Sequence, residues 1–181
     1  MATLFINAAF REGSRTLKLA ERYLAGNNRE VKRIELGDEY PQPLTRASLE
    51  VYNQSVSKRD FRDSMFDAAR QFVEADEIVI AAPFWNYSIP AVLHSYLEMV
   101  CSQGVSFDMD EKGNYYSLCK AKKLTYITTA GGPIPENDHA FGYIRDLCTV
   151  FWKIDDVRYY KAECLDVFGA DVEGILSRVI I

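Results

Sequence analysis

The chain has 181 residues, a length that fits one domain with a full hydrophobic core. Its 48% hydrophobic and 26% charged content is ordinary for a globular protein, and its net charge of −5 argues against nucleic acid or an anionic membrane as a partner. No apolar run is long enough to span a bilayer, and the first residues show no signal-peptide pattern. We therefore expect a single domain over residues 1–181 in the cytoplasm.

The cysteines carry no metal-binding pattern. They stand at positions 101, 119, 148 and 164, form no CxxC pair and have no histidine at ligand spacing beside them. We expect four reduced thiols and no metal site, as is typical of an intracellular protein.

The first part of the chain is predicted to alternate a strand, a helix and a strand. Residues 3–7 are a β-branched and aromatic run of strand length, and Ser14 is a suitable N-cap for a helix over 17–24. A second strand is expected over 30–36. Residues 37–57 contain two prolines and show no period, so we expect an irregular segment there.

The middle of the chain adds a helix, a strand and a loop rich in aromatic residues. Apolar residues at helical spacing predict a helix from Ser57 to Asp76, and residues 78–82 form an apolar run of strand length. The loop 83–88 follows, and Pro90 then begins a helix that ends near Cys101. Residues 105–118 hold Gly-Asn between two short β-like runs, which predicts a hairpin inserted at the edge of the sheet.

The last part repeats the alternation of strand and helix. A strand is predicted over 123–129 and is followed by a glycine turn. Asn137 or Asp138 caps a predicted helix that ends at Trp152, and a strand over 157–165 and a helix over 171–181 complete the chain. Strands alternating with helices indicate a parallel sheet covered on both faces. The expected fold is a flavodoxin-like α/β three-layer sandwich with a five-stranded parallel sheet in the order 2-1-3-4-5.

Three loops follow neighbouring strands of this sheet and are expected to meet at its carboxyl edge. The first, Gly13-Ser14-Arg15-Thr16, opens a helix, where free amides and hydroxyls bind anions. Read alone, Ser14 is equally an ordinary N-cap. The loop matches neither GxGxxG nor the GxxxxGK[ST] phosphate loop, so nucleotide binding of those types is not supported.

The second and third loops suit a planar ligand. Phe84, Trp85 and Tyr87 offer flat apolar surfaces, and Asn86 both donates and accepts hydrogen bonds. The glycine pair in 128–132 permits close approach of the backbone. Each loop also has a plain structural reading, as core aromatics and as a simple turn. Together the three describe a site for flavin mononucleotide (FMN).

The chain resembles the flavodoxin-like family of FMN-dependent NAD(P)H quinone reductases and azoreductases. Residues 83–90, Pro-Phe-Trp-Asn-Tyr-Ser-Ile-Pro, are similar to the family's Pro-Met-Tyr-Asn-Phe loop, and 104–107 are similar to its Gly-Val-Thr-Phe segment. Residues 128–132 resemble its glycine turn. The resemblance assigns FMN to residues of the three loops: Ser14, Thr16, Pro83, Phe84, Trp85, Asn86, Tyr87, Thr129, Ala130, Gly131 and Gly132.

The resemblance also implies partners. NADH or NADPH donates electrons, a small aromatic molecule such as a quinone or azo compound accepts them, and the chain forms a homodimer. Phe107, Phe151 and Trp152 are candidates to line an apolar substrate slot, although the last two equally suit a core or dimer interface. His139 is the one candidate proton donor, and otherwise an exposed residue at the start of a helix.

Departures from the family pattern leave two other functions open. Ala8, Ala9 and Ala130 stand where many members carry serines or an arginine. One alternative is a flavodoxin-like FMN electron carrier that docks on protein partners, and another is a scaffold that no longer holds flavin. The 105–118 hairpin favours the enzyme, because it would help to wall a substrate pocket.

Overall fold

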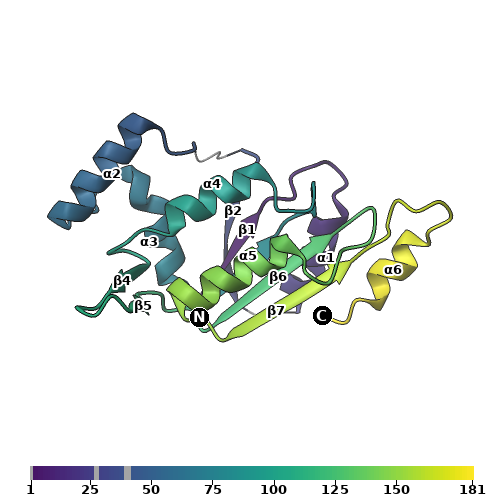
Figure 1. The fold of residues 1–181 in the computed structure, drawn as a ribbon. Coiled ribbons are helices and arrows are strands. Elements are labelled where there is room, and N and C mark those ends of the chain that lie inside the picture. The colour runs from purple at the N-terminus through teal and green to yellow at the C-terminus, as the bar shows by residue number, and fades with distance from the viewer. Residues whose placement is uncertain (1, 27–28, 39–41) are drawn as a thin grey trace.

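A five-stranded parallel sheet forms the centre of the molecule (Figure 1). The computed structural model describes residues 2–26, 29–38 and 42–181. The sheet strands are β1 (Ala2–Asn7), β2 (Glu30–Glu35), β3 (Glu77–Ala81), β6 (Lys123–Thr129) and β7 (Asp156–Ala162). Their order is β2-β1-β3-β6-β7, with every pair parallel. Since two short hairpin strands take the numbers 4 and 5, this is the predicted 2-1-3-4-5 order, which is confirmed.

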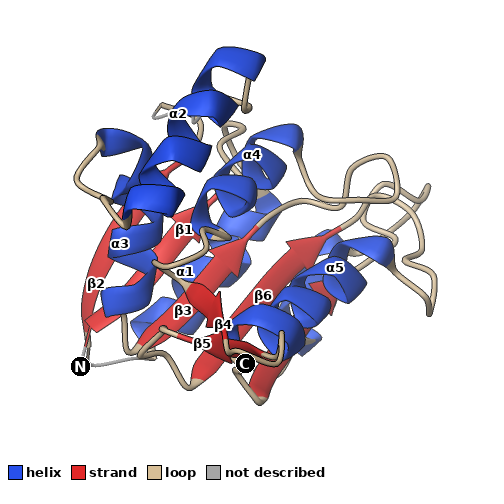
Figure 2. Ribbon diagram, turned by 60° about the vertical axis from the view of Figure 1, so that its left-hand side comes forward, coloured by secondary structure: helices blue, strands red, loops and turns tan. Residues whose placement is uncertain are grey.

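The strands turn alternate apolar side chains to opposite faces of the sheet, and helices cover both faces. In β1, Leu4 and Ile6 join one hydrophobic core and Phe5 joins the other. Helices α3 (Asp67–Glu74), α4 (Ala91–Val100) and α5 (His139–Leu147) pack on the first face, and α1 (Arg15–Ala25) and α6 (Val172–Arg178) on the second. Figure 2 shows α3 and α4 in front of the sheet and α1 behind it. The predicted three-layer sandwich is confirmed.

Helix starts are set by side-chain caps at the carboxyl edge of the sheet. Ser14 caps α1 by accepting a hydrogen bond from the amide of Leu17 at 3.3 Å, and Asp138 caps α5 by accepting from the amides of Ala140 and Phe141. Both caps were predicted. The Ser14 cap places the first turn of α1 directly beyond the loop that leaves β1.

The region between β2 and β3 differs from the prediction. Residues 37–57 were expected to be irregular, but Arg46–Lys58 forms helix α2. It begins with a capping box between Thr45 and Ser48 and ends at Arg59, whose φ is 53°. None of the described residues of α2 is buried, and its half-buried stripe has only two apolar side chains, Tyr52 and Val56, so sequence periodicity is weak there. Residues 39–41 of the predicted segment lie outside the described residues.

The helix predicted to start near Ser57 therefore starts later. A short 3₁₀ helix, Ser64–Phe66, leads into α3. The end of α3 at Glu74 agrees with the prediction. In Figure 1, α2 projects from one end of the molecule beside α4.

The predicted hairpin exists, but it is separate from the main sheet. Strands β4 (Phe107–Met109) and β5 (Tyr115–Ser117) pair with each other as a two-stranded antiparallel sheet. The hairpin is held by aromatic packing: the ring centre of Phe151 lies 4.4 Å from that of Phe107 and 4.9 Å from that of Tyr115. Aromatic side chains thus replace the backbone pairing that we expected at the sheet edge.

Candidate functional site

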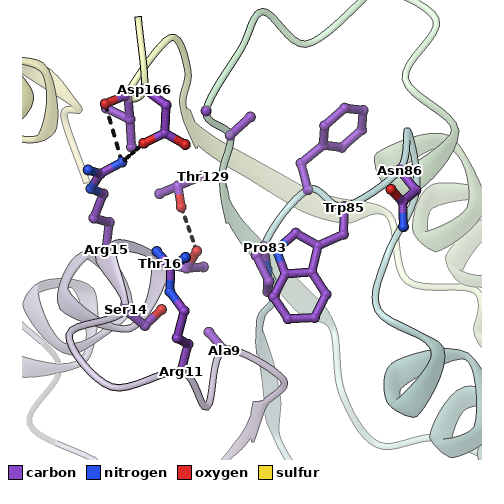
Figure 3. A pocket seen from close by; sticks show the side chains of 14 residues that line it. Ala9, Arg11, Ser14, Arg15, Thr16, Pro83, Trp85, Asn86, Thr129 and Asp166 are labelled. Atoms are coloured by element: carbon purple, nitrogen blue, oxygen red, sulfur yellow. Dashed lines mark hydrogen bonds and ion pairs between the residues drawn. The ribbon is translucent and has the colours of Figure 1, made fainter. Parts of the chain in front are cut away.

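A cavity of about 290 Å³ lies at the carboxyl edge of the sheet, where the loops after β1, β3 and β6 meet (Figure 3). The loop after β7 adds a fourth wall. The lining residues are Ala9, Arg11, Ser14, Arg15, Thr16, Pro83, Phe84, Trp85, Asn86, Thr129, Ala130, Gly131, Leu165 and Asp166. The predicted convergence of three loops is therefore present in the structure.

The wall formed by α1 offers hydrogen-bond donors to an anion. Ser14 and Thr16 are both buried, and within the described residues no acceptor takes the backbone N–H of Arg15 or Thr16. Free amides at a helix start carry a partial positive charge. This wall therefore has the chemistry that binds phosphate or carboxylate groups.

A hydroxyl pair joins the first and third loops. Thr16 Oγ1 lies 2.6 Å from Thr129 Oγ1, and both residues are buried. Two hydroxyls that share one hydrogen bond keep one further hydrogen to donate. The pair thus holds α1 against β6 and still presents a donor to a ligand.

Two arginines and one aspartate provide the charge of the cavity, and sequence reasoning missed all three. Arg15 Nη1 lies 2.6 Å from Asp166 Oδ1 and donates to the carbonyl of Leu165 at 3.2 Å. Figure 3 shows the Arg11 side chain extending beside Thr16. Arg15 lies within the predicted anion loop and Arg11 two residues before it, which was a usable signal. Asp166 is 151 positions from Arg15 and had none.

The aromatic loop closes on itself in a strained two-residue turn. Trp85 and Ser88 exchange backbone hydrogen bonds of 3.0 and 2.9 Å, and Asn86 and Tyr87 between them have φ of 52° and 63°. Non-glycine residues adopt such angles rarely and often at functional sites. The turn presents Trp85 and Asn86 to the cavity. Tyr87 is 67% exposed and does not line it.

The glycine loop is packed tightly against the loop after β7. A Cβ atom on Gly131 would lie 2.3 Å from Asp166 Oδ2, so only glycine fits while this carboxylate keeps its place. Gly131 and Gly132 accept backbone hydrogen bonds from Asp166 and Cys164. Within the described chain, the N–H groups of both glycines have no acceptor. Gly132 itself does not line the cavity.

The predicted substrate residues lie elsewhere. Phe107 and Phe151 belong to the aromatic cluster under the hairpin, and Phe151 lines a separate depression between α4 and α5. Trp152 is 1% exposed and packs on Phe72 with ring centres 4.5 Å apart, so it is a core residue. His139 is the exposed first residue of α5 and stands outside the cavity. None of these four residues lines the cavity.

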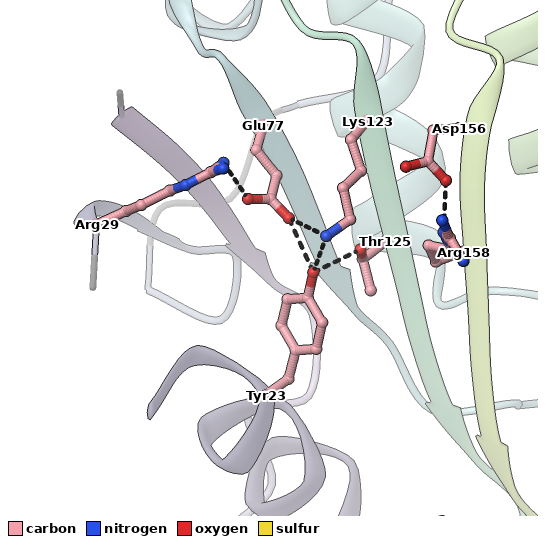
Figure 4. Close-up of polar contacts among 7 residues, drawn as sticks. All are labelled: Tyr23, Arg29, Glu77, Lys123, Thr125, Asp156 and Arg158. Atoms are coloured by element: carbon pink, nitrogen blue, oxygen red, sulfur yellow. Dashed lines mark hydrogen bonds and ion pairs between the residues drawn. The ribbon is translucent and has the colours of Figure 1, made fainter. Parts of the chain in front are cut away.

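A second polar cluster lies at the opposite, amino edge of the sheet (Figure 4). Buried Glu77 pairs with Arg29 at 2.6 Å and Lys123 at 3.0 Å, and accepts from the Tyr23 hydroxyl at 2.8 Å. Thr125 also contacts that hydroxyl. Tyr23 is on α1, Lys123 and Thr125 are on β6, and Arg29 immediately precedes β2, so we read the cluster as an ion-pair network that fastens α1, β3 and β6 together.

The described residues hold no group of His, Cys, Asp and Glu suited to a metal ion. All four cysteines are free thiols. Burial raises the pKa of Cys119 to about 11 and that of Cys101 and Cys148 to about 12, so these thiols stay protonated. In the same part of the chain, no helix has the length and apolar content to cross a membrane.

Comparison with known proteins agrees with the fold and the sequence motifs. The model of a family with a flavodoxin-like fold matches residues 1–178. An FMN-dependent NADH:quinone oxidoreductase of Clostridium acetobutylicum is 37% identical and covers 98% of this chain and 93% of its own. Its counterpart in Coprothermobacter proteolyticus is 33% identical over 94% of this chain and 89% of its own.

Solved structures show the same architecture. An azoreductase of Bacillus anthracis superposes with a TM-score of 0.83 over 98% of this chain and 93% of its own, at 24% identity. An FMN-dependent NADH-azoreductase of the same species, solved in complex with FMN, gives a TM-score of 0.80 at 20% identity over 98% of this chain and 93% of its own. The family match and the full-length relatives show that the chain belongs to the flavodoxin-like family of FMN-dependent NADH:quinone oxidoreductases.

Proposed function

We propose that the protein is an FMN-dependent NADH oxidoreductase that reduces quinones, azo compounds or similar small aromatic molecules. The observation that carries the proposal is the single cavity in which the anion-binding start of α1, the aromatic turn and the glycine loop meet. Full-length relatives named FMN-dependent NADH:quinone oxidoreductases support the same activity.

The residues of the cavity fit FMN. Hydroxyls, free amides and two arginines gather at one end, which suits the phosphate. Trp85 and Phe84 supply apolar surface for the isoalloxazine ring, and Asn86 a polar group for its edge. The free N–H groups of Gly131 and Gly132 suit the carbonyl-rich pyrimidine edge. At about 290 Å³ the cavity lies near the lower end of ligand pockets, roughly 300–1,000 Å³. It would enclose the phosphate and leave part of the ring at the mouth.

FMN supplies hydride and electron transfer when it is bound. The chain binds and orients it. Ser14 and Thr16 would donate to the phosphate, the turn at Trp85 would place the ring, and the amides of Gly131 and Gly132 would stabilise negative charge at the pyrimidine edge. These amides are held rigidly, because the carbonyls of both glycines accept hydrogen bonds from the loop after β7. His139 has no part in this arrangement.

One experiment separates this enzyme from an electron carrier. The purified chain is loaded with FMN, freed of excess flavin and mixed with one equivalent of NADH without oxygen. The enzyme is expected to lose the visible absorption of oxidised flavin at once and to regain it when a soluble quinone is added. A carrier would take up FMN but resist reduction by NADH. A chain that takes up no FMN would contradict both functions.

We further propose a homodimer of a single-domain chain in the cytoplasm. The projecting α2 exposes Leu49 and Val51, and the hairpin exposes Met109, Tyr115 and Tyr116. Exposed apolar groups on projecting elements favour a contact with a second copy. Light scattering after size exclusion would test the dimer. A single cooperative unfolding transition would support the single domain. Fractionation of the source cells would test the location.

A further inference from the structure

The ion pair between Arg15 and Asp166 spans the cavity between α1 and the loop after β7. The atoms Nη1 and Oδ1 are 2.6 Å apart, and both residues line the cavity. Arg15 is the first residue of α1 and stands between the two hydroxyl residues assigned to the phosphate. Its side chain is 30% exposed and that of Asp166 is 70% exposed. The Arg15 guanidinium lies at the proposed phosphate end of the site and is therefore already paired with the Asp166 carboxylate.

The position of Asp166 is built into the backbone. Its amide donates to the carbonyl of Gly131 at 2.9 Å, and its carboxylate lies where a side chain on Gly131 would be. Leu165 donates its amide to the carbonyl of Ala130 at 3.1 Å. These bonds hold the backbone of Asp166 beside the glycine loop independently of the ion pair.

The charged groups of the cavity lining are two guanidinium groups and this one carboxylate, which leaves a net charge of +1. A phosphate monoester carries a charge of about −1.5 to −2 at pH 7. The carboxylate therefore works against the phosphate in two ways: it occupies the guanidinium, and it repels a second anion beside it.

We propose that Asp166 competes with the FMN phosphate for Arg15, and that this competition sets how strongly the chain prefers FMN to riboflavin. The inference rests on the proposed FMN function. Riboflavin has the same ring and ribityl chain without the phosphate, so its binding is insensitive to the pair. Removing the carboxylate tightens FMN binding, whereas removing the guanidinium weakens it.

The structure provides a control ion pair that also begins on α1. Lys18 lies one turn further along α1 and pairs with Glu173 of α6 at 3.6 Å. Neither residue lines the cavity. Lys18→Gln and Glu173→Gln therefore remove one charge of each sign, from α1 and from α6, without touching the proposed site.

The test is a titration of FMN and riboflavin, followed by the quenching of flavin fluorescence, near neutral pH and at low salt. Asp166→Asn keeps the shape of the side chain against Gly131 and is expected to tighten FMN roughly two- to fivefold, because exposed charge pairs are weak. Arg15→Gln is expected to weaken FMN about tenfold, the effect of a lost charge-assisted hydrogen bond. Arg15→Lys falls between wild type and Arg15→Gln. All three cavity variants are expected to bind riboflavin within about twofold of wild type. The two control variants are expected to bind both FMN and riboflavin within the same range.

Four results overturn the inference. FMN binding that weakens in Asp166→Asn shows that the carboxylate orients Arg15 instead of competing for it. An equal change for FMN and riboflavin shows that Asp166 contacts the ring or ribityl chain. Controls that change as much as the cavity variants show an effect of overall charge. A wild-type chain that binds neither flavin contradicts the proposed function itself, whereas a chain that binds FMN without these differences contradicts the inference alone.

Discussion

Replacing Thr16 by valine removes one hydroxyl of the buried pair with Thr129 and keeps the shape of the side chain. The Thr129 hydroxyl lies 2.6 Å away, on a residue that is 8% exposed, and it then loses its protein hydrogen-bond partner. Leaving a buried polar group unpaired costs about 1–3 kcal/mol. For a chain of this size, each kcal/mol corresponds to roughly 2–4 °C in Tm. We therefore expect Thr16→Val to lower Tm by about 2–12 °C.

The double variant Thr16→Val, Thr129→Val separates stability from binding. Replacing both partners by apolar groups of the same shape is nearly neutral for stability, so Tm is expected to return close to wild type. FMN affinity should remain below that of wild type, because neither hydroxyl remains to donate a hydrogen bond to the ligand. Thermal unfolding and FMN titration of the two single variants and the double variant form the assay. Recovery of FMN affinity together with Tm would refute a ligand-binding role of the pair.

Three further predictions concern other parts of the molecule. Tyr23→Phe removes the hydroxyl at the centre of the cluster in Figure 4 and should lower stability by about 1–3 kcal/mol in urea unfolding, with FMN affinity unchanged. Gly131→Ala should lower stability in urea unfolding, because its Cβ would lie 2.3 Å from Asp166 Oδ2, whereas Gly132→Ala, with no atom within 4 Å, should unfold like wild type. The hydrogen bond from Arg59 lowers the pKa of Asp108 below its ordinary value of 3.8. The pair therefore stabilises the fold above that value, and the Tm difference between wild type and Asp108→Asn should shrink as the pH falls below it.

The fold was predictable because its central strands β1, β3 and β6 are buried on both faces. Runs such as 78–82 are continuously apolar, and each is followed by residues at helical spacing. Helix α2 was missed for the opposite reason: none of its described residues is buried, and its half-buried stripe has only two apolar side chains, Tyr52 and Val56. Its capping box, Thr45 with Ser48, depends on serine where glutamate or glutamine is usual.

The site was predictable as far as it depends on local sequence. Ser14, Trp85 and Gly131 each lie in a loop whose pattern suggests a ligand, and the strand order brings those loops together. Asp166 enters through a contact between distant segments, which no local pattern records. Trp152 shows the converse, because an aromatic residue at the end of a helix has the same sequence pattern whether it faces a substrate or the core.

The central claim is that one cavity of this chain binds FMN through the three loops. A stoichiometric titration of FMN into the purified chain tests it most directly, with the double valine variant beside it as the comparison. We predict that flavin fluorescence is quenched in proportion to added FMN up to one equivalent per chain, and that the variant shows this only at much higher concentration. Absence of saturable quenching in the wild-type chain, or equal affinity in the variant, would contradict the claim.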